Sequence, residues 1–454
     1  SNSIFMFFRH YKFTFYKFEP NKKRIFFNYK TEFKEGKSLF FTETVILPKI
    51  PNIRSINKKL INKLLESLHI ILGISYYKLY CPPAVAFPAR RSFSKGGAKV
   101  GAVLSKKEAD FWNIVYQKGL GEFFYENKLN PNISLKFPYK KNKKAKSYKL
   151  KAINSNCLVG VGGGKDSIVT AELLKQGGFD ITAFFVETDG NSELINKIIK
   201  IIGIKSLKIK RILDKKVYDQ HQYNGHIPIS AIYAFLGIFA AVLYKYPYFI
   251  VGNEYSSNFG NLKYKGQIIN HQWSKSFEFE KLFQDYISNF ITPDVFYFSL
   301  LRPFYEIRIA KLFAKHKKYF PYFSSCNRNF VAAEQMRNKS GNLPSSAKGF
   351  GWAKRGKLWC NRCPKCVFVF TLLSAFLKKK DLIKIFGRNL YKDETLLPLF
   401  KDILGLGKIH PHTNLKDKFG IAIAKSEAAL PVINDATNLI GKIGVGVKPF
   451  DCVG

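Results

Sequence analysis

The residues best suited to chemistry form a glycine-rich run: Gly162, Gly163, Gly164, Lys165, Asp166 and Ser167. Glycines can adopt backbone angles closed to other residues, so their N–H groups can converge on an anion. Lys165 adds an ammonium group, and Asp166 adds a carboxylate that can orient a metal ion or the loop itself. A helix beginning at Ser167 would contribute the positive end of its dipole. The run therefore predicts a phosphate site rather than an inert turn.

The spacing of this run excludes two common nucleotide motifs. Walker A needs four residues between its first glycine and Gly-Lys-Ser/Thr, and the run is not the dinucleotide pattern G-x-G-x-x-G either. It resembles the pyrophosphate loop of the N-type ATP pyrophosphatases, usually S-G-G-x-D-S, with Gly162 in place of the first serine. That resemblance implies an adenine nucleotide α-hydrolase-like (HUP) domain. It also implies cleavage of ATP between the α- and β-phosphates, which gives an adenylated substrate and pyrophosphate.

A second cluster has the spacing of metal ligands. Cys360, Cys363 and Cys366 follow one another at two-residue intervals, and Cys326 is the nearest candidate for a fourth ligand. Two overlapping Cys-x2-Cys steps let three thiolates reach one tetrahedral centre from a tight turn. We predict structural zinc, with an iron–sulfur cluster or a redox pair as the alternatives. The other cysteines are expected to be plain apolar residues: Cys81, Cys157 and Cys452.

Candidates for catalysis follow from the edge of a predicted sheet. Glu254 and His271 come after a predicted strand, at the edge where open parallel sheets bind ligands, and His226 precedes an apolar helix. With Lys165 these three are the catalytic candidates. Either histidine alone is as consistent with an ordinary loop position, so the proton donor and acceptor stay unassigned.

The elements that must position these residues alternate between strand and helix. Apolar runs at 157–161, 179–187, 206–213 and 248–252 predict strands, and 168–178, 192–204 and 227–244 predict helices. This alternation predicts an α/β fold with a parallel sheet covered on both faces. We expect this domain to span 151–320, and the cysteine-bearing C-terminal region 321–454.

Residues 1–150 have a different pattern and predict an N-terminal α+β domain. Residues 13–33 read as two strands joined by a turn at Pro20 and Asn21, and 55–74 carry apolar residues at helical spacing. The Lys-rich segment 137–156 is expected to be a linker, and the Gly/Ser/Lys-rich segment 340–357 a loop.

The uncharged segment 227–244 approaches the ~18 residues of a membrane span. Pro228 suits the first turn of a helix, and a strand candidate follows, so we predict a buried helix instead. The start of the chain shows no secretory signal. We therefore expect a soluble, cytoplasmic protein without membrane insertion.

The formal net charge of +42 invites a nucleic-acid interpretation. The excess is mostly lysine, spread along the whole chain, whereas arginine is favoured for bidentate phosphate and base contacts. We therefore predict a solvated basic surface and no dedicated nucleic-acid groove.

Longer segments resemble one family from about residue 10 to the end of the chain. They are HIILGISYYKLYCPP, VGVGGGKDSIVT, NGHIPISAI, VGNEYSSN, HQWSKS, LRPFYEIRIAKLFA, SSCNRNF, WCNRCPKCVFVF and KPFDCVG. Together they are similar to the UDP-N-acetylmuramoyl-L-alanyl-L-glutamate epimerase family. The resemblance implies a peptidoglycan-precursor enzyme that uses ATP and Mg²⁺ to invert the terminal L-Glu of UDP-MurNAc-L-Ala-L-Glu, releasing AMP and pyrophosphate.

Adenylation explains the use of ATP. Deprotonation beside a free carboxylate would place two negative charges side by side, whereas an ester-like acyl-adenylate lets a modest general base take the α-proton. The loop, the cysteines and the charge leave open a nucleobase- or tRNA-modifying pyrophosphatase, or a basic zinc module that binds nucleic acid.

The resemblance also suggests contacts to a UDP-sugar peptide, with residues 1–150 as a candidate substrate-binding part. The substrate-binding candidates are Tyr76, Lys78, Asn253, Glu254, Trp273, Ser274, Lys275 and Arg302. The pair Tyr76 and Tyr77 is equally consistent with a core position, and Arg308 with a helix-surface charge.

Overall fold

The structure of the chain is a computed structural model. It describes residues 8–49, 53–87, 99–100, 104–131, 135–142, 146–150, 155–188, 192–219, 221–260, 262–326 and 358–403. The predicted loop 340–357, the segment KPFDCVG at 448–454 and Cys452 lie outside these ranges.

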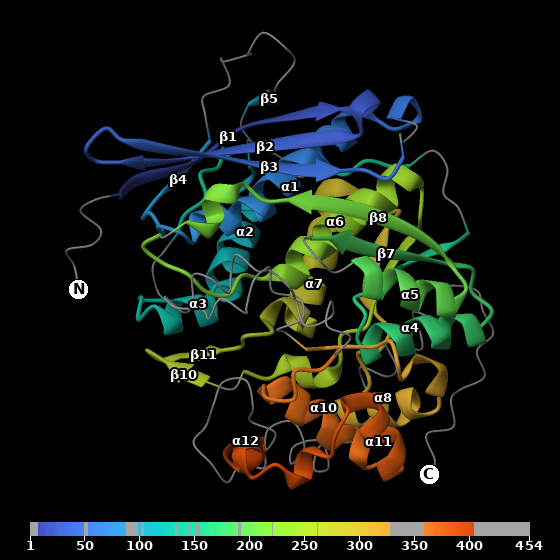
Figure 1. Cartoon of the computed structure of the whole chain (residues 1–454). Coiled ribbons are helices and arrows are strands. Elements are labelled where there is room, and N and C mark those ends of the chain that lie inside the picture. The colour runs from blue at the N-terminus through green and yellow to red at the C-terminus, as the bar shows by residue number, and fades with distance from the viewer. Residues whose placement is uncertain are drawn as a thin grey trace.

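Five parallel strands form one half of a ten-stranded sheet, and the sheet is drawn in Figure 1. Their spatial order is β12 (Phe296–Ser299), β9 (Tyr248–Val251), β6 (Cys157–Gly160), β7 (Ile181–Glu187) and β8 (Lys205–Ile212). The chain moves from β6 toward β7 and β8, and then crosses to the other side for β9 and β12. The order therefore reverses beside β6, and connections that diverge at such a point leave a crevice at the carboxyl ends of the strands.

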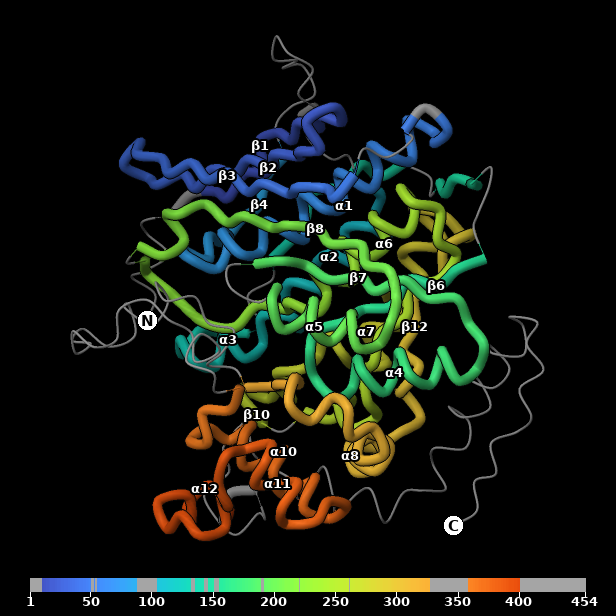
Figure 2. The backbone as a smooth tube through the Cα atoms, turned by 45° about the vertical axis from the view of Figure 1, so that its right-hand side comes forward, coloured from blue at the N-terminus to red at the C-terminus, as the bar shows by residue number. Residues whose placement is uncertain are grey.

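The N-terminal strands continue the same sheet. β1 (Phe8–Glu19), β2 (Arg24–Phe33) and β3 (Ser38–Ile46) form an antiparallel meander, with the predicted turn present as a short helix, Pro20–Lys22. β3 pairs antiparallel with β8, and Figure 2 shows the two side by side. β4 (Val85–Ala86) and β5 (Lys99–Val100) pair with β1, whereas β10 (Leu262–Tyr264) and β11 (Gln267–Ile269) form a separate hairpin. The predicted domain boundary near residue 150 thus falls between parts of one sheet.

A buried ion pair joins the meander to the parallel strands. The Arg211 guanidinium on β8 donates from Nε to Glu43 Oε1 on β3 at 2.6 Å and from Nη2 to Ser75 Oγ at 2.8 Å. Burial raises the pKa of the Glu43 carboxyl, and Arg211 opposes that shift. Because both charges are buried, removing either partner would lower the free energy of unfolding substantially.

Helices cover both faces of the sheet, as predicted. One face carries α1 (Lys58–Tyr77), α2 (Lys106–Gly119), α3 (Gly121–Glu126), α6 (Ile229–Tyr244) and α7 (Phe277–Tyr286). The other carries α4 (Lys165–Gln176), α5 (Ser192–Ile202), α8 (Glu306–Ala314), α10 (Pro364–Ser374), α11 (Lys379–Phe386) and α12 (Leu397–Ile403). Along β6, Leu158 faces the first core and Val159 the second, because successive strand side chains point to opposite faces.

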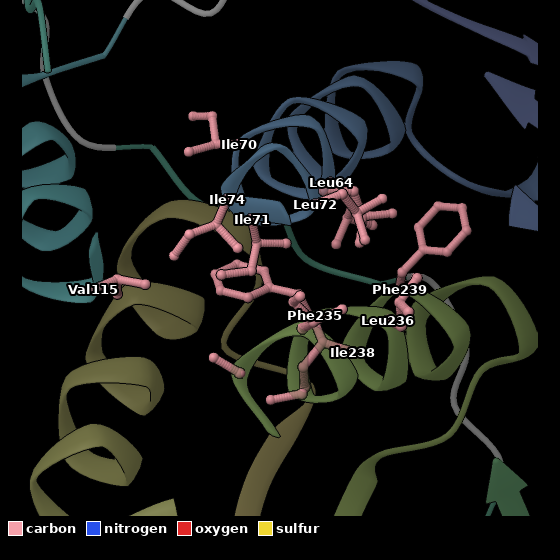
Figure 3. Packing of buried hydrophobic residues seen from close by; sticks show 14 of the residues in the cluster. Leu64, Ile70, Ile71, Leu72, Ile74, Val115, Phe235, Leu236, Ile238 and Phe239 are labelled. Atoms are coloured by element: carbon pink, nitrogen blue, oxygen red, sulfur yellow. The ribbon is translucent and has the colours of Figure 1, made fainter. Parts of the chain in front are cut away.

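The apolar segment that resembled a membrane span is the buried helix α6. It packs against α1, with Phe235 near Ile71 and Ile74 (Figure 3). Gly237 allows the contact with β9, since an added Cβ would lie 2.0 Å from a Phe249 ring carbon. Among the described residues, no helix combines the length and the apolar character needed to cross a membrane.

Candidate active site

The glycine-rich run connects β6 to α4 at the point where the strand order reverses. The helix begins at Lys165, with Gly164 as its N-cap, so the predicted start at Ser167 is wrong by two residues. Gly163 has φ of +87°, a conformation that favours glycine. Gly162 N donates to Ser167 Oγ at 3.3 Å, and that hydroxyl donates to Gly164 O at 3.0 Å. The loop is therefore closed by its own hydroxyl, with its backbone at the positive end of α4.

Three carboxylates meet beside this loop. Asp166 lies in the first turn of α4, Glu254 follows β9 and Glu306 begins α8, and one carboxylate oxygen of each lies within 4.8 Å of the others. Oxygen ligands at this spacing suit a hard cation such as Mg²⁺. Nζ of the buried Lys165 bonds the carboxylates of Asp166 and Glu306. Burial lowers the pKa of Lys165, but the charges of these carboxylates outweigh it and hold the pKa above its usual value.

A cavity of about 400 Å³ opens over the glycine-rich run, and we call it the loop cavity. Its lining includes Gly162, Gly164 and Ser167 of the run, together with Thr188 after β7 and Asn253 after β9. The cavity therefore lies at the carboxyl edge of the parallel strands, where the sheet topology predicts ligand binding. Its volume is in the range of small-molecule sites.

A second cavity of about 370 Å³ adjoins it and contains both candidate histidines. We call it the histidine cavity, and its lining includes His226, His271, Glu122, Glu254 and Ser274. His226 Nδ1 lies 3.5 Å from Oε2 of the buried Glu122 on α3. An imidazole held by a carboxylate is suited to move a proton.

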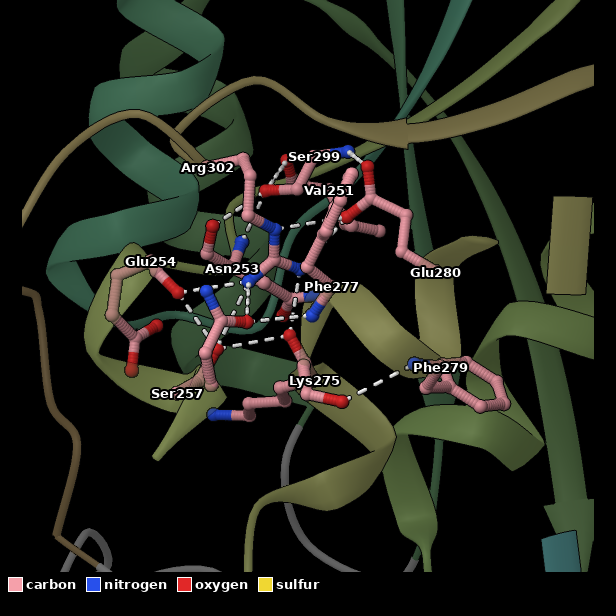
Figure 4. A network of polar contacts seen from close by, with 12 residues as sticks. Val251, Asn253, Glu254, Ser257, Lys275, Phe277, Phe279, Glu280, Ser299 and Arg302 are labelled. Atoms are coloured by element: carbon pink, nitrogen blue, oxygen red, sulfur yellow. Dashed lines mark hydrogen bonds and ion pairs between the residues drawn. The ribbon is translucent and has the colours of Figure 1, made fainter. Parts of the chain in front are cut away.

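Arg302 lines neither of these two cavities and instead fixes their walls (Figure 4). Its buried guanidinium donates to Glu254 O at 2.9 Å and to Lys275 O at 2.7 Å, and it pairs with Glu280 at 2.7 Å. Burial raises the pKa of the Glu280 carboxyl, and the Arg302 charge opposes this. The structure thus assigns Arg302 to the support of two cavity residues, not to direct contact with a ligand there.

Three further substrate candidates also point away from the two cavities. Tyr76 is fully buried, and its hydroxyl accepts from Asp214 N at 3.2 Å. Lys78 Nζ donates to Gly225 O at 2.7 Å, which supports the turn just before His226. Trp273 Nε1 donates to a Glu278 carboxylate oxygen at 2.9 Å. None of these three side chains lines either cavity, and Arg308 is exposed on α8.

The structure brings the four predicted ligand cysteines together. Their Sγ atoms lie within 4.8 Å of one another, and all four residues are buried. The Cys360–Cys366 and Cys363–Cys366 sulfur distances are 3.6 and 3.4 Å. Thiolates bound at about 2.3 Å to one tetrahedral ion would stand about 3.8 Å apart, so the group fits a single metal ion. Hydrogen bonds from the other three thiols hold the pKa of Cys360 below its usual value.

The segment that carries Cys326 is hydrogen-bonded directly to the glycine-rich run. Ser324 N, two residues before Cys326, donates to Gly163 O at 3.1 Å. Cys363 is the N-cap of α10, and Cys366 lies in its first turn. Cys81 and Cys157 are buried elsewhere, as expected for apolar residues.

Three charged residues of the histidine cavity were missed in the sequence: Glu122, Glu306 and Lys365. Lys365 lies inside the cysteine run and lines both cavities. Burial lowers the pKa of Lys365 to about 8, helped by Lys275 and opposed by nearby carboxylates. The signal for Lys365 was its place between two ligand cysteines. Glu122 and Glu306 had no comparable signal.

Comparison with known proteins gives the following matches. Residues 5–300 match the model of the MurL N-terminal domain, and residues 322–429 match the model of the MurL C-terminal domain. A UDP-N-acetyl-alpha-D-muramoyl-L-alanyl-L-glutamate epimerase from Xanthomonas oryzae pv. oryzae is 35% identical over 368 residues, 80% of this chain and 73% of the relative. Proteins of the same name from Micromonospora sp. and Salinispora tropica are 32% and 31% identical over 81% and 87% of this chain, and over 75% and 79% of their own length.

Proposed function

The chain belongs to the MurL family, and from this membership we propose that it is an ATP-dependent epimerase of the terminal glutamate in UDP-MurNAc-L-Ala-L-Glu. The observation that supports the ATP requirement is the glycine-rich run at the point where the strand order reverses. The loop cavity over this run adjoins the histidine cavity. The product is the D-Glu epimer, a peptidoglycan precursor, and ATP and water become AMP and pyrophosphate. Because ATP and UDP-sugar precursors are cytoplasmic compounds, we expect the reaction in the cytoplasm.

ATP would lie in the loop cavity, with its phosphates over the N–H groups of the run and the first turn of α4. The three carboxylates Asp166, Glu254 and Glu306 would hold Mg²⁺. Bound there, Mg²⁺ supplies positive charge against the pyrophosphate that leaves. Nζ of Lys165, which bonds the carboxylates of Asp166 and Glu306, would keep two of these ligands in place.

The peptide end of the substrate would enter the histidine cavity. Adenylation of its α-carboxylate removes the negative charge that opposes loss of the α-proton. His226, supported by Glu122, and His271 are the groups that we propose for proton removal and return on opposite faces of the α-carbon. Hydrolysis of the acyl-adenylate then releases the epimer and AMP.

We propose zinc as the metal of the four-cysteine group. A four-iron cluster places its own iron–sulfur core between the thiolates and needs them further apart than a single ion does. Sulfur distances of 3.4 and 3.6 Å support one tetrahedral ion. Thiolate ligands and the tie to Gly163 support a structural role.

Product analysis tests the proposed function. Purified protein is incubated with ATP, Mg²⁺ and UDP-MurNAc-L-Ala-L-Glu, and the glutamate configuration is determined by chiral derivatisation. We expect AMP and D-Glu to appear together and to depend on both substrates. Bound ATP without either product would contradict the proposal and direct the search to deazapurine and tRNA substrates.

A further inference from the structure

The loop cavity and the histidine cavity share a short stretch of wall. The shared residues are Asp166, Ser230, Lys275, Ser325 and Lys365. They come from five separate segments of the chain and include two lysines. Any ligand group that passes from one cavity to the other must cross this stretch, so its chemistry decides what can react there.

The two lysines are held on different supports. Lys275 ends the short helix Trp273–Lys275, and its carbonyl accepts from Arg302 Nη2 at 2.7 Å and from Ser257 Oγ at 2.9 Å. Lys365 is the second residue of α10, between Cys363 and Cys366 of the cysteine group. Each lysine backbone is thus fixed by the surrounding structure, which suits side chains that must hold a defined position.

The charges around Lys365 indicate what the shared wall binds. Lys275 repels Lys365, while Asp166, Glu254 and Glu306 attract it. These three carboxylates already surround Lys165 and form the candidate cation site. Once a cation neutralises these carboxylates, the two ammonium groups of the shared wall repel each other unless an anion stands between them. The shared wall is therefore suited to an anionic ligand group.

We propose that Lys275 and Lys365 clamp the substrate's α-carboxylate against the α-phosphate of ATP, and that they are catalytic residues of adenylation. This proposal rests on the proposed function. A carboxylate oxygen attacks the α-phosphorus, the bond from that phosphorus to the oxygen of the β-phosphate breaks, and pyrophosphate leaves with the electron pair. No proton moves and nothing is oxidised or reduced.

The clamp addresses the main obstacle of this step. Attack brings the carboxylate against a phosphate of the same sign, and negative charge builds up on the oxygens of the α-phosphate. Fixed positive groups in a site with little water stabilise that charge, and loss of one such group typically lowers a rate by about 10²–10³-fold. The cysteine group acquires a second role, because the turn that collects the thiolates also sets the position of Lys365.

The test compares Lys365→Met with Arg362→Gln. Arg362 lies in the same cysteine turn but is exposed and lines neither of the two cavities, so its replacement removes the same charge without touching the wall. Three quantities are measured: bound metal per chain, the dissociation constant of Mg·ATP, and exchange of labelled pyrophosphate into ATP in the presence of UDP-MurNAc-L-Ala-L-Glu. The exchange reports adenylation without the later proton transfers.

For Lys365→Met we expect wild-type metal content, a dissociation constant for Mg·ATP within about threefold of wild type, and exchange slowed about 10²–10³-fold. Arg362→Gln should match wild type in all three. Lys275→Met tests the clamp at a residue away from the cysteines. We expect it to slow pyrophosphate exchange by the same factor and to leave the metal content unchanged.

Exchange within threefold of wild type in either lysine variant would overturn the clamp while leaving the proposed function intact. Absence of exchange in the wild-type protein would instead refute the proposed function, and the clamp with it. If the Lys365→Met protein loses its bound metal, a loss of exchange could follow from that alone. The exchange rate of Lys275→Met then tests the clamp.

Discussion

Replacing Arg302 by leucine separates the structural and the catalytic consequences of the network in Figure 4. Arg302 and Glu280 are 2% and 4% exposed, so the change leaves a buried carboxylate without its cation. Breaking a buried ion pair in this way costs about 3–5 kcal/mol of unfolding free energy. The loss should shrink at low pH, because Glu280 then becomes protonated: an acid whose pKa is raised in the fold loses stability as pH rises.

The double variant Glu280→Leu/Arg302→Leu is the matched control. Apolar residues in place of a buried ion pair are often neutral or stabilising, so most of the lost stability should return. Both carbonyls keep a donor, because Glu254 O still accepts from Ser257 N at 3.3 Å and Lys275 O still accepts from Ser257 Oγ at 2.9 Å. They are no longer joined by the guanidinium, however, and we expect the rate of AMP formation to remain at least about tenfold low, because loosely held catalytic groups act poorly.

The assays are the midpoint of urea unfolding, followed by circular dichroism, and the initial rate of AMP formation with the UDP-linked dipeptide. Recovery of both stability and rate in the double variant would refute the positioning role and leave Arg302 as a charge partner only. An Arg302→Leu protein as stable as wild type would refute the buried network itself.

Three other perturbations test separate parts of the structure. Lys165→Ala and Asp166→Ala should each abolish AMP formation in a protein that still folds, with the exposed Lys197→Ala as control. Lys165→Ala should also lower the unfolding midpoint, because it leaves Asp166 and Glu306 without their buried cation. Turnover within tenfold of wild type would contradict the phosphate-site assignment. Cys363→Ser should lower both thermal stability and the bound metal per chain, measured by mass spectrometry. The control is Cys157→Ala, which lies outside the group and should keep its metal. An unchanged metal stoichiometry in Cys363→Ser would remove Cys363 from the ligand set. His69 is buried, and burial lowers its pKa to about 4 from 6.5, so the folded protein keeps it neutral. The unfolded chain binds a proton below pH 6.5, and stability should therefore fall by up to about 3 kcal/mol between about pH 6.5 and 4. We expect this part of the pH dependence to be absent from the His69→Gln variant when urea midpoints are measured across the range. If the midpoint of the variant falls with pH as steeply as that of the wild type, His69 is not the cause.

The order of elements could be predicted because local patterns carry it. The strands at 157–160, 181–187, 205–212 and 248–251 and the helices between them were each expected from apolar runs and their spacing. Strands whose side chains are buried on both faces, such as 157–160 and 181–187, leave little choice but a parallel sheet under helices. The missed start of α4 has a local reason: Gly164 caps the helix from its backbone, so no side-chain cap marked the position.

The continuation of the sheet through the N-terminal meander had no such local signal. β3 and β8 are separated by more than 150 residues, and their pairing covers only a few positions at the end of each strand. Alternating apolar residues predict that a strand buries one face, but they do not name its neighbour. The buried Glu43–Arg211 pair, invisible in the sequence, marks where the two parts meet.

The sequence by itself determined the glycine-rich turn between a strand and a helix and three of the four clustered cysteines, since both depend on residues a few positions apart. Only the tertiary structure decided which distant side chains face them. Glu306 reaches Lys165 because α8 begins beside the loop, and Lys365 reaches the same wall because the cysteines turn α10 toward it. Arg302, which looked like a ligand contact, became a support because folding placed carbonyl oxygens and Glu280 around it. The role of a charged side chain depends on what burial brings within a few ångströms of it, and neighbours in the sequence do not reveal that.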